Sequence, residues 1–184
     1  LRSQDALTAR PLPQALCAEA VMNHKNAVFK QIFLGFASIL ILGGLLWLVI
    51  PNPIAPDRVM YTLSWSALFS IPLFLGIHTT LFQRFGSEDL IKGHASSGKL
   101  GFHGAYLSNT AEQALVNVLT AISLGMVVPV EFIKVVPIQA CIFIVGRVWF
   151  FVAYKKDPMS RFAGFAMGYY AAVISLVLIL CWSF

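Results

Sequence analysis

The sequence predicts an all-α integral membrane protein. Of its 184 residues, 58% are hydrophobic and only 11% are charged, whereas a soluble domain carries about 25% charged residues. Several apolar runs reach the roughly 20 residues that a helix needs to cross the hydrocarbon core of a bilayer. Proline-rich or polar segments separate these runs and end the helices. We therefore expect one compact bundle of five membrane-spanning helices with the lipid bilayer around it.

The N-terminal part of the chain divides into a tail and a first span. Residues 1–26 are more polar and show no clear periodicity, so we expect a loosely structured tail. Because the chain begins at Leu1, we expect a fragment or a processed chain. Residues 27–50 are continuously apolar and predict the first span, with Trp47 as an interfacial aromatic near its end.

The second span, residues 58–85, follows a proline-rich turn at residues 51–57. Pro72 lies in the middle of this span and predicts a kink, because proline removes one hydrogen bond of the helix. His78 lies near the far end of the span. An isolated histidine in a membrane helix is more often hydrogen-bonded to a neighbouring helix than a ligand.

Three further spans complete the predicted bundle. A polar loop at residues 86–101 leads to the third span at residues 102–128, and the fourth and fifth spans follow at residues 132–154 and 159–182. The first half of the third span is unusually polar. Polar side chains on a membrane helix normally face the bundle interior or a water-filled pocket, so this half is a candidate site wall.

The basic residues predict the orientation. With five spans, the N-terminal tail, the 86–101 loop and the 155–158 turn share one side, where ten of the 13 lysines and arginines lie; the other side has only Arg58 and Lys134. This bias places the basic side, and the N-terminus, in the cytosol. It also explains the net charge of +5 without a nucleic-acid partner, for which we find no motif. The cysteines and histidines show no spacing that predicts a metal site.

Arg147 is the remaining basic residue and lies inside the fourth span. A buried arginine needs a counter-charge, and Glu112 is the best candidate in the other spans. One interpretation is structural: an Arg–Glu tie between helices, with Asn109 hydrogen-bonded across the interface. The other is a cytosol-facing pocket in which Arg147 and Arg161 bind carboxylates or stabilise a thiolate while Tyr154 donates a hydrogen bond.

These residues carry a resemblance to a known family over about residues 58–182. The chain has Asn109-Thr110-Ala111-Glu112, then Arg147 and Tyr154 seven positions apart, then Arg161 downstream. This order resembles that of the membrane-associated proteins in eicosanoid and glutathione metabolism, the MAPEG superfamily. The resemblance implies a MAPEG-like four-helix transmembrane domain over residues 51–184, with the first span as one extra N-terminal helix.

The same resemblance implies a site and an assembly. It implies a homotrimer that holds glutathione between subunits near the cytosolic side. Arg161 takes the catalytic role of stabilising the glutathione thiolate. Asn109, Glu112, Arg147 and Tyr154 take glutathione-binding roles. The matching activity is that of a glutathione-dependent transferase or peroxidase acting on lipophilic electrophiles that enter from the bilayer.

Three positions depart from the family pattern. Ala105 replaces an arginine, Gln113 replaces a common aromatic residue, and Phe150 replaces a tyrosine. The missing arginine and hydroxyl would each have supplied an anion contact of about 1.5–3 kcal/mol. Five spans with a long tail, and the run at residues 58–63 that leads to residues 71–77, resemble the divergent, mattrin-like members of the family. That resemblance implies an endomembrane protein (Golgi, ER or lysosome) with reduced or absent catalytic activity and membrane-protein partners.

Overall fold

The computed structural model describes residues 14–53, 57–85, 99–157 and 159–184, and these residues are helical apart from short connections. Five of the helical segments are long and apolar enough to cross a membrane. The prediction of an all-helical, multi-pass protein is therefore confirmed. The elements are α1 (Gln14–Val49), α2 (Arg58–Ser66), the 3₁₀ turn η1 (Ala67–Phe69), α3 (Ser70–Phe85), α5 (Lys99–Val127), the 3₁₀ turn η2 (Val130–Phe132), α6 (Val135–Lys156) and α7 (Arg161–Ser183).

The start of α1 corrects one prediction. The helix begins at Gln14, so the expectation of a loosely structured tail over residues 1–26 is wrong for residues 14–26. This segment contains three alanines and one each of glutamine, leucine, glutamate, methionine and lysine, and it contains neither glycine nor proline. These are strong helix formers, and their propensity outweighs the lack of an apolar period. The remainder of the predicted tail and most of the predicted 86–101 loop lie outside the described residues.

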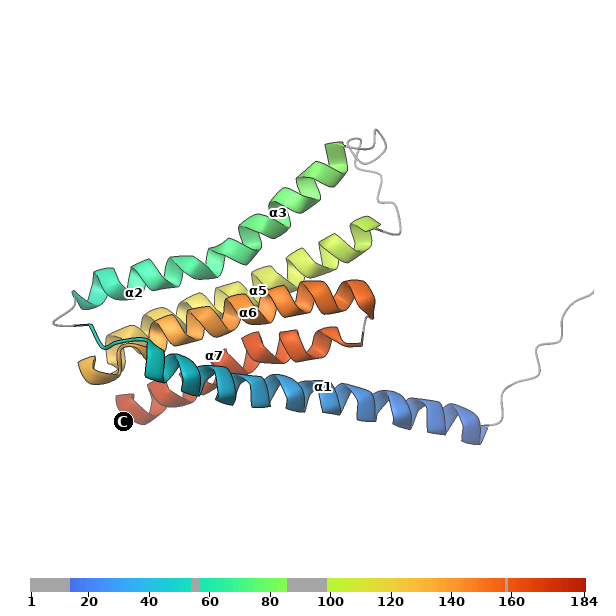
Figure 1. Ribbon diagram of the computed structural model, residues 1–184, viewed down its shortest axis with the longest axis horizontal. Helices are drawn as coiled ribbons and strands as arrows, with labels where there is room; N and C mark the ends of the chain where they lie inside the picture. Colours follow the sequence, from blue (N-terminus) through green and yellow to red (C-terminus); the bar gives the residue numbers. More distant parts are fainter. Residues whose placement is uncertain (1–13, 54–56, 86–98, 158) are drawn as a thin grey trace, which may run out of the picture.

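Pro72 breaks the second span as predicted. The 3₁₀ turn η1 separates α2 from α3 just before this proline, because residue 72 has no N–H to continue the α-helical pattern. Figure 1 shows that α3 diverges from α5 beyond this break. His78 is exposed on α3 and packs beside Phe82 with ring centroids 5.7 Å apart.

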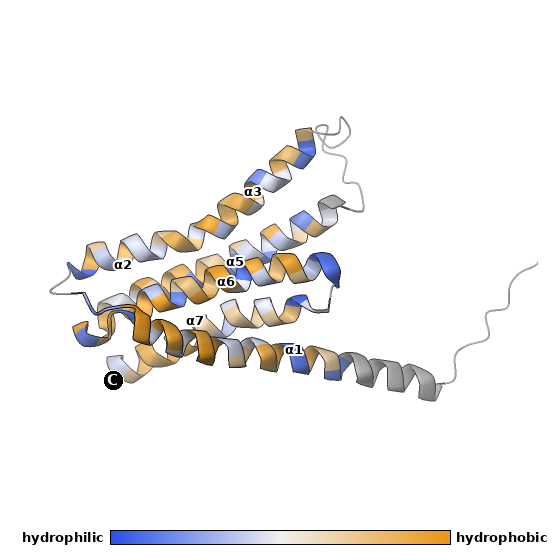
Figure 2. Cartoon of the chain, viewed as in Figure 1, coloured by the Kyte–Doolittle hydropathy of each residue, from blue (hydrophilic) through white to orange (hydrophobic). Residues whose placement is uncertain are grey.

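The bundle is built around α7, which packs against α6, α1 and α5 (Figure 1). Small residues allow this packing: a Cβ added to Gly35 of α1 would lie 2.7 Å from the Cβ of Ala166 in α7. Membrane helices associate through such small-residue contacts because lipid provides no hydrophobic force between helices. Figure 2 shows that hydrophobic residues predominate along the helices, and many of the large ones are exposed on the bundle surface, as expected for contact with lipid.

A basic residue fastens the C-terminal end of α1 to the beginning of α6. Lys134 Nζ donates a hydrogen bond to the Trp47 backbone oxygen at 2.9 Å and lies 4.1 Å from the centroid of the Trp47 ring. The ammonium thus binds an otherwise free carbonyl at the C-terminus of α1. Trp47 and Lys134 mark the end of the bundle opposite the α6–α7 connection.

Candidate functional site

Arg147 is fully buried between α5, α6 and α7, with 0% of its surface exposed. Its Nη1 donates to Asn109 Oδ1 at 2.8 Å and its Nη2 donates to the Gly164 backbone oxygen at 3.2 Å. The guanidinium also lies 4.9 Å from the centre of the Phe150 ring, a distance at which the ring face attracts a cation. The three contacts fix the side chain across the helix interfaces.

The Gly164 carbonyl reaches Arg147 because α6 and α7 approach each other closely there. A Cβ added to Gly164 would lie 2.6 Å from the Gly146 backbone oxygen, and one added to Gly146 would lie 2.9 Å from the Met167 Cβ. Neither position therefore tolerates a side chain at this helix separation. The small residues bring a backbone oxygen of α7 within hydrogen-bonding distance of the buried guanidinium.

Glu112 is not the counter-charge of Arg147, so that prediction is wrong. The Glu112 side chain is exposed on α5, and its Oε1 accepts a hydrogen bond from Ser108 Oγ at 3.4 Å. Asn109 and Glu112 are three positions apart, yet only the asparagine turns toward Arg147. The helix rotation that buries Thr110, Gln113 and Asn117 leaves Glu112 at the outer edge of the helix.

Arg161, the predicted catalytic residue, lies next to Tyr154 at the α6–α7 connection. The guanidinium carbon of Arg161 is 4.5 Å from the centre of the Tyr154 ring. The connection is a tight turn in which Asp157 Oδ2 accepts from the Ser160 N–H at 3.1 Å and Ser160 Oγ donates to the Ala153 oxygen at 3.0 Å. These hydrogen bonds fix the turn after which α7 begins and keep Arg161 close to the C-terminal end of α6.

A hollow of about 250 Å³ opens beside Arg161, and we call it the arginine recess. It is lined by Ala105, Asn109, Phe150, Arg161, Phe162 and Phe165. Of the predicted site residues, Asn109 and Arg161 line this recess. Arg147 does not line it but donates a hydrogen bond to Asn109, and the Tyr154 ring packs against the Arg161 guanidinium. Glu112 and His78 do not line it.

Two of the family departures, Ala105 and Phe150, are walls of the arginine recess. Phe150 is only 3% exposed and brings no hydroxyl, and Ala105 brings no charge. Arg161 is therefore the one charged group among the lining residues. A cationic and amide wall opposite apolar surface suits an anionic group on an otherwise apolar or weakly polar ligand.

A buried polar network extends from the arginine toward the other end of the bundle. Asn117 Nδ2 donates to the Gln113 oxygen at 2.9 Å and to the Gly168 oxygen at 3.1 Å. Gln139 Nε2 donates to Asn117 Oδ1 at 3.1 Å and to Thr120 Oγ1 at 2.9 Å. In the sequence, Gln139 is a single amide in an otherwise apolar run, and this weak signal did not predict its place in the network.

The described residues contain no group of three histidine, cysteine, aspartate or glutamate side chains that could hold a metal ion. Comparison of the chain with protein-family models, curated proteins and solved structures finds no match in any of the three. The fold and the site together identify the chain as a multi-pass, all-helical membrane protein with a cationic recess.

Proposed function

We propose that this protein is a MAPEG-like, mattrin-like membrane protein of the endomembrane system with reduced or absent catalytic activity. In this proposal the arginine recess faces the cytosol and the chain acts together with membrane-protein partners. The observation that carries it is the composition of the recess wall: Ala105 and Phe150 supply neither charge nor hydroxyl beside Arg161. Glutathione carries two carboxylates, and the lining residues of the recess offer only one guanidinium to pair with them.

A homotrimer is part of this proposal, and Glu112 supports it. Glu112 lies about 16 Å along α5 from Gly101, at 1.5 Å per residue, and is therefore deep inside the candidate span 101–127. A carboxylate facing hydrocarbon at that depth is costly. The neighbouring α5 positions Leu115 and Leu119 are also exposed, at 63% and 57%. Further copies of the chain, packed on this face of α5, would cover the carboxylate and complete the recess.

Calorimetry tests whether the protein binds reduced glutathione, which the glutathione-dependent activity would require. The protein, purified in detergent, should give no binding heat up to about 1 mM glutathione, the concentration that corresponds to a binding free energy of about −4 kcal/mol. Arg161→Ala and the matched control Arg84→Ala, an exposed arginine of α3, should behave like the wild type. The proposal fails if the wild type binds, Arg161→Ala abolishes the binding and Arg84→Ala preserves it.

The second candidate function is a glutathione-dependent transferase or peroxidase acting on lipophilic electrophiles. The placement of Arg161 and Asn109 in one open recess favours it, because a guanidinium stabilises a thiolate and lowers the cost of forming the nucleophile. Conjugation of a model electrophile by the wild type, lost in Arg161→Ala and retained in Arg84→Ala, would establish this function and exclude the first.

The two departures provide a gain-of-binding test. The double substitution Ala105→Arg with Phe150→Tyr adds a charge and a hydroxyl to the recess wall. Each of the two added contacts contributes about 1.5–3 kcal/mol, so together they should raise glutathione affinity roughly a hundredfold or more. Calorimetry on the double variant measures this. An unchanged affinity in a folded double variant would show that the recess does not hold glutathione in the orientation that the family resemblance implies.

A further inference from the structure

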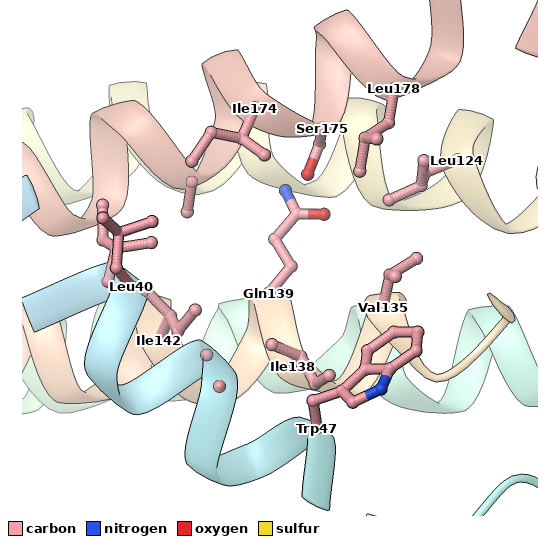
Figure 3. Close-up of a pocket in the computed structure, with 14 residues that line it drawn as sticks. Leu40, Trp47, Leu124, Val135, Ile138, Gln139, Ile142, Ile174, Ser175 and Leu178 are labelled. Carbon is pink, nitrogen blue, oxygen red and sulfur yellow. The ribbon is translucent and has the colours of Figure 1, made fainter. Parts of the chain in front are cut away.

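A second cavity lies at the other end of the bundle, between α1, α6 and α7 (Figure 3). Its volume is about 230 Å³, larger than an engineered cavity of about 150 Å³ that binds benzene. Along α6, Gln139 in this cavity is separated from Arg147 by about 12 Å at 1.5 Å per residue. We call it the α1 cavity, and it does not depend on the arginine recess or on the function proposed above.

Glycines of α1 form the mouth of the α1 cavity. A Cβ added to Gly44 would meet no atom within 4 Å, and one added to Gly43 would meet only the Ile142 Cδ1, at 3.6 Å. Gly44 and Leu40 are exposed and lie on a helix long enough to cross the membrane. The cavity therefore opens sideways, toward the hydrocarbon that surrounds the bundle.

The inner wall of the α1 cavity is polar at two points. Gln139 of α6 and Ser175 of α7 both line the cavity, and Figure 3 shows their polar ends extending from the two helices into the region between them. Gln139 is 3% exposed, and its Oε1 has no hydrogen-bond partner among the described residues. The Nε2 of the same amide is fixed by Asn117 and Thr120, so the amide orientation leaves the oxygen as a free acceptor.

We propose that the α1 cavity binds a lipophilic alcohol taken from the bilayer. A hydroxyl donates one hydrogen bond and accepts another, which matches the Gln139 oxygen as acceptor and the Ser175 hydroxyl as donor. None of the described residues that line the cavity is charged, so an ionic head group would be desolvated without compensation. The apolar remainder of the wall suits a hydrocarbon body. A sterol and a long-chain aliphatic alcohol share this chemistry.

Binding of labelled alcohols to the full chain in sterol-free phosphatidylcholine bilayers tests the proposal. The probes are tritiated cholesterol and tritiated 1-dodecanol, each competed with its unlabelled form and with the analogue that lacks the hydroxyl, cholestane or dodecane. At least one probe should bind saturably, and its deoxy analogue should compete at least about tenfold more weakly, the loss of one to two hydrogen bonds. The probe that binds identifies the source of the alcohol.

Three variants locate the binding. Gly44→Leu fills open space at the mouth and should weaken binding more than roughly tenfold. Ser175→Ala removes one hydrogen bond and should weaken it about three- to tenfold. Leu48→Phe adds bulk to an exposed position of the same helix outside the cavity lining and should change nothing.

The proposal is overturned if neither probe binds saturably or if the deoxy analogues compete equally well. It is also overturned if binding survives Gly44→Leu unchanged, because the alcohol would then bind elsewhere. Thermal unfolding of Gly44→Leu checks that the variant is folded. If it is not, unchanged binding in Ser175→Ala decides against the proposal.

Discussion

Arg147 brings a permanent charge into the centre of the bundle, and both of its hydrogen-bond acceptors are neutral. The Asn109 amide oxygen and the Gly164 backbone oxygen replace the carboxylate that the sequence led us to expect. Glu112 was the expected counter-charge because the other spans contain almost no acidic residues. The rotation of α5 about its axis, however, decides which side chain faces Arg147. The spacing of three residues puts Asn109 and Glu112 on one side of the helix. Spacing does not show which of the two side chains is buried and which is exposed.

A double-mutant cycle measures the contact between Arg147 and Asn109. Arg147→Met leaves the Asn109 oxygen unpaired, and Asn109→Leu leaves one guanidinium N–H unpaired, so each single variant should lose stability. The double variant should lose less than the sum, by roughly 1–3 kcal/mol. Unfolding of the detergent-solubilised protein, followed by circular dichroism, gives the free energies.

The matched control pairs Arg147→Met with Glu112→Gln. Because Glu112 does not contact Arg147, these two changes should add within about 0.5 kcal/mol. Additivity of the Arg147–Asn109 pair, or coupling of the Arg147–Glu112 pair, would contradict the hydrogen bonds described above.

At the scale of elements, small residues decide how closely the helices approach. The sequence predicted the existence of five spans because length and hydropathy alone set the requirement for crossing a bilayer. The sequence did not predict which glycines lie at helix contacts. Gly35 lies where α1 touches α7, whereas Gly44 of the same helix has open space beside it, and the residue type alone does not distinguish the two positions. Nor did the sequence predict that α1 begins at Gln14, because residues 14–26 lack an apolar period and form a helix through their helix propensity.

The same substitution at these two glycines of α1 should have opposite results. Gly35→Leu forces a side chain against Ala163 and Ala166 of α7 and should destabilise the protein by about 1–3 kcal/mol, as overpacking does. Gly44→Leu meets no neighbour and gains helix propensity, so its stability should equal or exceed that of the wild type. Thermal unfolding of both variants in one detergent compares them directly, and equal losses would contradict the α1–α7 packing.

At the scale of the whole molecule, two of the five residues to which the family resemblance gives a role in one site, Asn109 and Arg161, line the arginine recess. The position of Tyr154 beneath Arg161 follows from the turn at Asp157. Assembly and orientation concern the molecule as a unit. The proposed homotrimer rests on the outward position of Glu112, the proposed orientation rests on the distribution of basic residues, and each has its own experiment.

Native mass spectrometry of the detergent-solubilised protein should detect a trimer. Leu119→Trp places a bulky side chain on the exposed face of α5 and should shift the population toward monomers, because overpacking costs about 1–3 kcal/mol. Leu75→Trp is the control, since Leu75 is similarly exposed, at 61%, on α3. A monomeric wild type, or equal effects of both substitutions, would exclude assembly through this face.

Glycosylation of inserted acceptor sites determines the orientation in the membrane. A flexible segment with an N-glycosylation acceptor, inserted after Asn52, should be glycosylated, because the distribution of basic residues predicts that this turn lies on the side away from the cytosol. The same segment inserted after Asp157 should remain unmodified. Gel mobility with and without glycosidase treatment distinguishes the two, and the reverse pattern would place the arginine recess on the lumenal side.

The neutral partners of Arg147 have a consequence for compartments of differing acidity. An arginine keeps its proton throughout the physiological range, and neither an amide nor a backbone carbonyl titrates. A guanidinium–carboxylate pair would gain a proton on its acidic member in a sufficiently acidic organelle. Here Arg147 and its two acceptors keep the same charge in a neutral and in an acidified environment, so transit between such compartments leaves this contact electrically unchanged.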